Sequence, residues 1–420
     1  MYQVQDSSAL VAGHRALLRP KAHGLRVPRT VVLLGFTSLL TDISSEMVAA
    51  VLPLYLVYAA GFSPLALGVI DGLYRGAAAI AALASGFAAD RRKRHKEIAS
   101  LGYGLSAICK LGLVLAGSAV SAIGALVMVD RIGKGIRTAP RDALISLSAS
   151  PNSLGLAFGV HRAMDTTGAM LGPLLAFGIL ALAPLAFTSV FLVSFCVALA
   201  GLGVIVLLVP KHRERTAGKP PVSLRAIAPL LLVPRFRAVV VAASLLGLAT
   251  ISDAFLYLAM QRHLELPPAA FPLLFVGSSL AFMVLAVPVG RLSDRIGRGR
   301  VFIGGYLLLL PVYASLLAPS TGIAGLAIGL ALIGASYAAT DGVLAALAST
   351  TLDEDVRGSG LAVVTTATNL ARFVASVGFG ALWTFAGLDT AVLVCAIALA
   401  LAVVVTALVL RASRPEPAGA

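Results

Sequence analysis

The sequence consists of apolar segments that follow one another, each about as long as a membrane-spanning helix. A helix needs about 20 mostly apolar residues to cross the hydrocarbon core, and twelve such segments fall between Val31 and Leu410. Only 12% of the residues are charged, about half of the roughly 25% that is usual in soluble domains. Inside lipid, a helix can satisfy its own backbone hydrogen bonds. The sequence therefore predicts an all-α membrane protein with twelve transmembrane helices.

The basic residues are distributed unevenly along the chain. Most of the 33 lysines and arginines lie near the termini and in the loops that follow even-numbered spans, whereas the opposite loops hold Arg262. Because basic loops stay in the cytoplasm, both termini are predicted to be cytoplasmic in a multi-pass protein of the cell membrane. The net charge of +14 is thus a topology signal, and nucleic acid is not an expected partner. Cys109, Cys196 and Cys395 lie in apolar spans and are expected to be reduced packing residues.

A loop pattern occurs twice and divides the chain into two halves. The first copy contains Gly86, Asp90 and Arg91, and the second contains Gly290, Asp294, Arg295 and Gly297, with the aspartates 204 residues apart (294 − 90). Such a repeat predicts two six-helix bundles. The expected parts are a cytoplasmic tail over 1–30, a bundle over 31–209, a cytoplasmic linker over 210–236, a bundle over 237–411 and a tail over 412–420.

These motifs resemble those of the major facilitator superfamily. The repeated Gly-x-x-x-Asp-Arg loop is similar to that superfamily's loop motif, and Arg131-xxx-Gly135 is similar to its Arg-xxx-Gly motif. Gly168-xxx-Gly172-Pro173 resembles the Gly-Pro motif of its proton-coupled antiporters. The resemblance covers Val31 to Leu410 and implies the major facilitator fold, whose two halves move around a central solute site.

The motif residues also have structural interpretations. The loop residues from Gly86 to Arg91 and from Gly290 to Gly297 are expected to cap and latch helices at the cytoplasmic face, as a gate. Gly168, Gly172 and Pro173 predict close helix packing with a kink. For Arg131 two alternatives stay open: hydrogen bonding between helices, or the part in proton coupling that the resemblance implies.

Eight acidic and eight basic residues fall within the predicted spans. A charge at a helix centre costs about 2.5 to 3.5 kcal/mol, so facing all of them to lipid would cost roughly 40 to 55 kcal/mol, against a net stability of about 5 to 15 kcal/mol. Most must therefore pair or face a wet cavity. The acids are Asp42, Glu46, Asp71, Asp130, Asp142, Asp165, Asp253 and Asp341, and the bases are Arg75, Lys110, Arg131, Lys134, Arg137, Arg141, Arg162 and Arg372.

Four titratable residues within the predicted spans are candidates for proton coupling. Asp42 and Glu46 lie one turn apart in the first span, which holds no basic residue, and His161 and Asp165 lie in the fifth. Titratable groups at mid-depth suit a proton relay; the alternative is neutralisation by nearby bases. Asp42 is preferred, because Asp253 occupies the related position of the second half.

The fourth span carries a basic stripe. Lys134, Arg137 and Arg141 recur on one helix face, and Arg162 follows in the fifth span. Fixed cations that line a cavity favour an anionic or zwitterionic solute, with Asp253 and Asp341 as further cavity candidates. Alternatively, Lys134 reaches Asp165, and Arg141 extends to the inner membrane surface.

The sequence lacks the motifs that are typical of other functional classes. No Walker A sequence, HExxH motif or nucleophile elbow occurs, so we expect a transporter with no cofactor or metal, not an enzyme. We also expect it to be a monomer. Its partners would be a small solute, protons and the bilayer. The leading hypothesis is proton-coupled efflux of a small organic solute. The alternatives are uptake or exchange of an organic anion, by symport or facilitated diffusion, and a sensor or lipid-handling protein that transports nothing.

Overall fold

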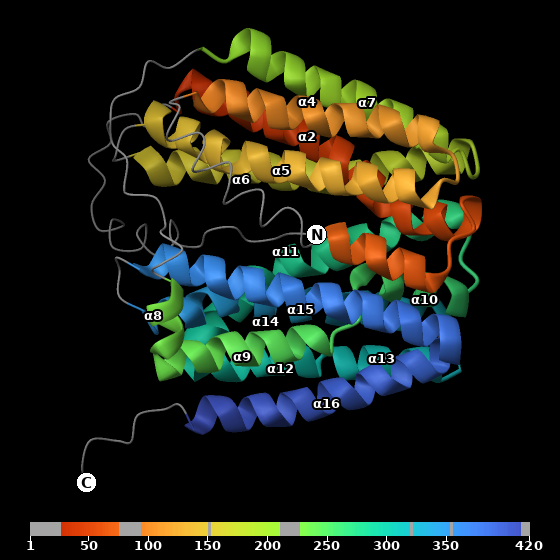
Figure 1. Ribbon diagram of the computed structural model, residues 1–420, viewed down its shortest axis with the longest axis vertical. Helices are drawn as coiled ribbons and strands as arrows, with labels where there is room; N and C mark the ends of the chain where they lie inside the picture. Colours follow the sequence, from red (N-terminus) through yellow and green to blue (C-terminus); the bar gives the residue numbers. More distant parts are fainter. Residues whose placement is uncertain are drawn as a thin grey trace.

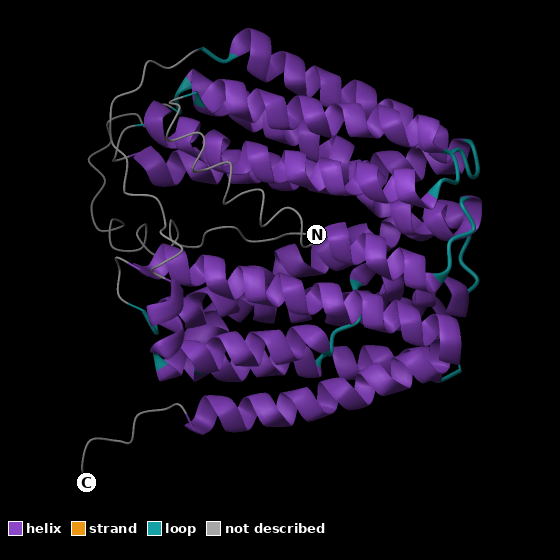
Figure 2. Cartoon of the chain, in the orientation of Figure 1, coloured by secondary structure: helices purple, strands orange, loops and turns teal. Residues whose placement is uncertain are grey.

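The computed structural model describes residues 27–74, 94–149, 153–210, 227–319, 322–352 and 356–412. These residues are almost entirely helical, and none of them forms a strand (Figure 2). The first half comprises α2 (Arg29–Leu54) with η1 (Tyr55–Ala59), the helix Pro64–Tyr74, α4 (His95–Ala116), α5 (Val120–Ser148), α6 (Leu154–Leu182), and α7 (Phe187–Gly203) with η3 (Val204–Leu208). The second half comprises α8 (Ile227–Leu232), α9 (Pro234–Leu248), α10 (Asp253–His263), η5 (Pro268–Ala270), α11 (Phe271–Ile296), α12 (Arg298–Leu307), α13 (Leu309–Leu317), α14 (Gly322–Ser349), α15 (Arg357–Ala386) and α16 (Leu388–Ala412).

The predicted fold class is confirmed. Within the described residues, 10 helices are long and apolar enough to cross a membrane. The 29 residues of α5 are equally long but carry the charges from Asp130 to Asp142, and the apolar helix Pro64–Tyr74 lies where the second span was expected. The helices α9 and α10 together form one span that is interrupted at residues 249–252.

The two halves of the chain form separate helix bundles. In Figure 1 most helices of the first half lie above the midline and those of the second half below it, whereas the helix Pro64–Tyr74 lies against α15 of the second half. Within the range 210–236, where a linker is expected, the described residues form α8 and the start of α9. Pro234 stands in the first turn of α9, where a missing backbone N–H costs nothing.

Glycines set the distance between α2 and α6. A Cβ atom on Gly168 would overlap the carbonyl of Leu39, and one on Gly172 would overlap the carbonyl of Ile43. The two helices therefore touch backbone to backbone, as small residues allow in membranes. The helix α6 continues through Pro173 without interruption.

The halves meet where η1 ends and the helix Pro64–Tyr74 begins. The hydroxyl of Tyr58 donates to Gln261 Oε1 at 3.0 Å, and the backbone N–H of Leu65 donates to Thr384 Oγ1 at 2.9 Å. Deeper in the same interface, Ser376 Oγ donates to Asp71 Oδ2 at 2.8 Å. These contacts join the ends of the spans that lie opposite the basic loops.

Candidate functional site

Two polar pairs connect α2 to α6, one helical turn apart. Ser38 Oγ lies 2.9 Å from His161 Nε2, and the carboxyl groups of Asp42 and Asp165 lie within hydrogen-bonding reach of each other. Because α2 and α6 run parallel and touch through glycine, residues one turn apart on one helix meet residues one turn apart on the other.

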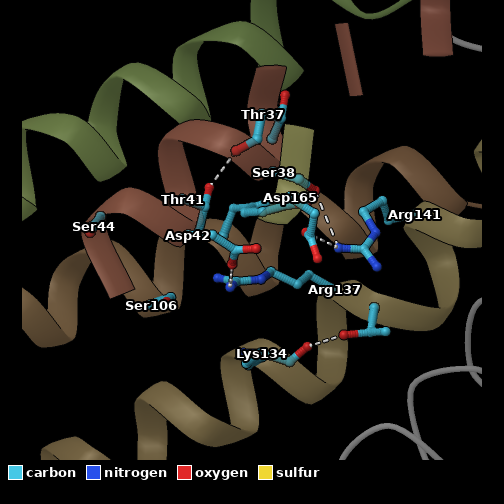
Figure 3. A network of polar contacts seen from close by, with 12 residues as sticks. Thr37, Ser38, Thr41, Asp42, Ser44, Ser106, Lys134, Arg137, Arg141 and Asp165 are labelled. Carbon is cyan, nitrogen blue, oxygen red and sulfur yellow. Dashed lines mark hydrogen bonds and ion pairs between the residues drawn. The ribbon is translucent and has the colours of Figure 1, made fainter. Parts of the chain in front are cut away.

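The helix α5 brings two arginines to this carboxyl pair. Arg137 Nη2 lies 3.8 Å from Asp42 Oδ1, and Arg141 Nη1 lies 3.7 Å from Asp165 Oδ1 (Figure 3). Arg141 also donates to Ser38 Oγ at 3.2 Å and to Asp142 Oδ1 at 2.9 Å. We call Ser38, Asp42, Lys134, Arg137, Arg141, His161 and Asp165 the N-terminal polar network.

The residues of the predicted basic stripe differ in how far they are exposed to solvent. Arg137 is only 2% exposed, its guanidinium lies 4.9 Å from the centre of the Tyr103 ring, and its Nη1 has no hydrogen-bond partner within the described residues. Lys134 is half-buried, and the described residues give its ammonium no ion pair within 4.0 Å. Arg162 is exposed. Of the three stripe residues, Arg137 is thus buried, whereas Lys134 and Arg141 are half-buried.

The charges of the network and of the neighbouring Asp142 balance only while all three acids are ionised. Lys134, Arg137 and Arg141 give three positive charges, and Asp42, Asp165 and the neighbouring Asp142 give three negative ones. Two adjacent carboxylates repel, and sharing a proton relieves the repulsion. One bound proton leaves the group with one excess positive charge.

Glu46 lies one turn from Asp42, but not at the carboxyl pair. Its Cβ lies beside Gly172, and its charge acts on Arg131. Arg131 bonds to the adjacent Asp130 and stacks 3.9 Å above the Tyr74 ring. Asp130 also accepts from Lys110 Nζ at 3.0 Å. This second charge cluster fastens α4 to α5.

The C-terminal half holds a related group of charges, which we call the C-terminal polar network. Tyr337 donates to Asp253, and Arg372 Nη2 lies 3.6 Å from Asp341 Oδ1. Tyr306 hydrogen-bonds to Arg372. Asp253 is the first residue of α10, directly after the interruption between α9 and α10, where the free N–H groups of the helix favour a carboxylate.

The second copy of the loop motif forms a latch between helices. Asp294 on α11 accepts from Arg298 at 3.1 Å, and Arg298 Nη1 donates to the carbonyl of Ala346 on α14 at 3.1 Å. Gly297 has φ of +101°, a conformation that favours glycine. The first copy, with Gly86, Asp90 and Arg91, lies outside the described residues, as does Arg75.

Sequence reasoning missed the neutral members of these networks. Ser38, Tyr103 and Tyr337 were not among its candidates, although each contacts a charged or titratable candidate residue. The sequence does hold a signal for Ser38: it precedes Asp42 by one helical turn, and His161 precedes Asp165 by the same spacing. In the described part of the chain, no three His, Cys, Asp or Glu side chains are arranged to hold a metal ion.

Comparisons with known proteins show a family match over both halves of the chain. The family model described as Major Facilitator Superfamily matches residues 34–260 and again 238–420. An uncharacterized MFS-type transporter of Methanocaldococcus jannaschii is 32% identical over 365 residues, which cover 84% of this chain and 88% of that protein. An uncharacterized protein of Mycobacterium tuberculosis is 36% identical over 154 residues, or 37% of each chain.

Solved structures share the fold at low sequence identity. The nucleoside transporter NupG has a TM-score of 0.76 at 13% identity, over 92% of this chain and 100% of its own. A bacterial homolog of the human lysosomal transporter Spinster, solved in an inward-facing and unoccupied conformation, has a TM-score of 0.68 at 15% identity, over 93% and 98%.

Proposed function

Because the chain belongs to the Major Facilitator Superfamily, and is thus a membrane transporter and not an enzyme, we propose that it carries an organic anion together with protons. The observation that supports this proposal is the contact between the carboxyl groups of Asp42 and Asp165. In this proposal the pair is the proton site, and the cations of α5 bind the anionic group of the solute.

The charge balance couples the two ligands. Without a bound proton, these two carboxylates and that of Asp142 together compensate the three cations of α5. When the pair takes up a proton, one negative charge is lost and the cations attract an anion more strongly. By linkage, the anion in turn favours proton binding. The charges that face the pair are Lys134, Arg137 and Arg141 from α5 and His161 from α6. Proton and anion thus promote each other's binding, which is the condition for symport.

Efflux by proton exchange is the second candidate, and the Gly-Pro motif of α6 favours it. Antiport requires that proton and solute compete for one site, as a cationic solute would compete for Asp42 and Asp165. An anion does not compete with a proton at this site. The contacts of Gly168 and Gly172 with α2 explain the motif as a site of close helix packing. Such packing favours neither efflux nor uptake. For an anionic solute, symport is therefore the better-supported candidate.

The proposed setting is the cell membrane, with the protein as a monomer. If the basic loops lie in the cytoplasm, both termini are cytoplasmic and the contacts of Tyr58 and Leu65 close the outer end between the halves. The two halves would then rock against each other around the two polar networks.

The sign of a pH change distinguishes the candidates. Purified protein is reconstituted in liposomes that contain a pH-sensitive dye, and pools of organic anions and zwitterions are added outside. Symport predicts that the lumen becomes acidic as solute enters, beyond the change in protein-free liposomes. Antiport predicts an alkaline lumen. Solute uptake without a protein-dependent pH change indicates facilitated diffusion and contradicts the proposal.

A further inference from the structure

The span that α9 and α10 form together is interrupted near its centre, and we propose that this interruption binds a sodium ion. The span runs from Pro234 to His263 over 30 residues, and residues 249–252 between the two helices are not helical. The proposed ligands are backbone carbonyls of the interruption, the hydroxyl of Ser252 and the carboxylate of Asp253. This inference goes beyond proton-coupled anion transport and does not depend on it.

The interruption leaves backbone oxygens without hydrogen-bond donors. None of the described residues donates a hydrogen bond to the carbonyls of Ala249, Thr250 or Ile251. A buried carbonyl without a partner costs free energy, and Ala249 and Ile251 are only 6% and 1% exposed. A cation can bind several such oxygens at once, and interrupted helices in membrane proteins coordinate sodium in this way.

The hydroxyl of Ser252 lies at the start of α10 but does not cap this helix. A serine at the N-cap position usually accepts a hydrogen bond from a backbone N–H of the first turn, whereas Ser252 makes no capping bond through its side chain. The residue is 9% exposed, and its Oγ is buried with no hydrogen-bond partner among the described residues. Because a buried hydroxyl without a partner is destabilising, a ligand at this oxygen would remove that cost.

The end of α9 also favours a cation. The carbonyl end of a helix carries a partial negative charge, and the last turn of α9 holds no basic residue. The side chain of Arg372 lies beside Gly247 near this end. Its guanidinium, however, faces Asp341 at 3.6 Å and donates to none of the carbonyls at 249–251. These carbonyls are therefore not bonded to the arginine next to them.

Asp253 supplies a carboxylate directly after the interruption. It is buried and accepts a hydrogen bond from Tyr337. A carboxylate has about four acceptor sites, so this bond and the further contacts of Asp253 are compatible with a cation at the same group. Carbonyl, hydroxyl and carboxylate oxygens are hard ligands that select hard cations. A single carboxylate among neutral oxygens matches the one charge of sodium.

Tertiary contacts maintain the interruption. In a continuous helix the N–H of Ile251 would donate to the carbonyl of Gly247, but it donates to Tyr313 Oη at 2.9 Å instead. Tyr313 lies on α13 and is fully buried. The helix α10 also contacts α2 of the other half. An ion that fixes the interruption would thus act next to the interface between the halves.

Sodium binding can be measured without a solute. Purified protein in detergent is heated in sodium chloride or in choline chloride at equal concentration and pH. A ligand that binds only the folded state raises the melting temperature, and more so as its concentration rises. We expect the protein to melt several degrees higher in sodium chloride and to bind radioactive sodium in a saturable manner.

Ser252→Ala tests the hydroxyl ligand. The substitution removes a buried hydroxyl that has no partner, so in choline chloride the variant should melt at or above the wild-type temperature. We expect it to bind sodium about tenfold more weakly than the wild type does. The control is Ser336→Ala, which removes a buried hydroxyl of α14 that donates to the carbonyl of Ile333 at 2.7 Å. It should bind sodium as the wild type does.

Asp253→Asn tests the carboxylate ligand. The substitution removes the charge and keeps the shape of the side chain, so we expect saturable sodium binding to be lost. The control is Asp389→Asn, because Asp389 also lies in the first turn of a helix, α16, but is exposed. It should keep sodium binding.

The outcomes separate this inference from the proposed function. If the wild type does not bind sodium saturably, the inference is overturned whatever the liposomes show. If Ser252→Ala and Asp253→Asn bind sodium as the wild type does, the ion binds elsewhere and the inference is again overturned. Should Asp253→Asn fail to fold, Ser252→Ala decides. If sodium binds as expected and no solute changes the pH of the lumen, the sodium site stands and proton-coupled transport is overturned.

Discussion

The carboxyl groups of Asp42 and Asp165 lie within hydrogen-bonding reach of each other across the interface between α2 and α6. Each is also faced by an arginine of α5, Arg137 for Asp42 and Arg141 for Asp165. A proton bound between two helices can couple to their relative position, because it alters the repulsion between them. The same proton alters the charge available to a solute at α5.

Neutralising one acid should separate binding from energy coupling. The Asp42→Asn variant lacks the negative charge of Asp42 at every pH, as if the proton were always bound. We expect exchange of labelled solute to continue and accumulation driven by a pH gradient to be lost. Solute affinity should rise on acidification in the wild type and become independent of pH in the variant, as measured by binding to purified protein.

Glu46→Gln is the matched control for that prediction. Glu46 lies one turn further along α2, where its charge acts on Arg131. We expect it to keep gradient-driven accumulation at a rate near that of the wild type. If Asp42→Asn accumulates solute uphill as well as the wild type does, Asp42 is not the proton carrier, and Asp165 with His161 becomes the next candidate.

Two cations one turn apart on α5 should differ in their roles. Arg137 is buried against Asp42 and Tyr103, and removing one partner of a buried ion pair costs about 3 to 5 kcal/mol. We therefore expect Arg137→Gln to lower the melting temperature by several degrees. Lys134→Gln should keep the melting temperature and raise the half-saturating solute concentration about tenfold. The reverse pattern would place Arg137 at the solute.

The contact between α2 and α6 should not tolerate a methyl group. A Cβ on Gly168 would overlap the backbone of Leu39, and overpacking of this kind costs about 1 to 3 kcal/mol. We expect Gly168→Ala to melt at a lower temperature in detergent. Gly178→Ala, on the same helix with open space at its Cβ, should melt at or above the wild-type temperature. Equal melting temperatures would mean that α2 and α6 do not pack this closely.

Much of the fold could be predicted from the sequence because lipid restricts the possible structures. Span length, the repeated loop motif and the embedded charges each follow from the cost of exposing polar groups to hydrocarbon. Helical spacing showed that Asp42 and Glu46 share a face of their helix. It could not show which residue of another helix meets that face.

The partners within the site depend on how the helices dock. Asp42 meets Asp165 because glycines on α6 bring the two helices into register. Arg137 is buried although it lies on the same stripe as Lys134, because α4 places Tyr103 over it. Such details depend on the rotation of each helix about its axis, which a one-turn spacing does not determine.

Sidedness can be tested by labelling single cysteines. With Cys196, which is exposed, replaced by Ser, we expect Ser63→Cys to react with an impermeant thiol reagent from outside intact cells. Arg298→Cys, next to the second loop motif, should react only after lysis. Labelling of the Arg298 position from outside would reverse the assignment of the basic loops to the cytoplasm.

The contact between Leu65 and Thr384 should have to open during transport. The backbone N–H of Leu65 donates to Thr384 Oγ1 at 2.9 Å, so their Cα atoms lie close enough for a disulfide. In the Leu65→Cys/Thr384→Cys variant, oxidation should hold the halves together at this end and stop solute transport, and a reductant should restore it. The matched control is Ser44→Cys/Ser194→Cys, which joins α2 to α7 within one half, where the two hydroxyls lie 2.8 Å apart. Because each half would move as a unit, this disulfide should leave transport intact. Full transport activity after complete oxidation of the Leu65/Thr384 pair would show that solute passes without separation of the halves at this end.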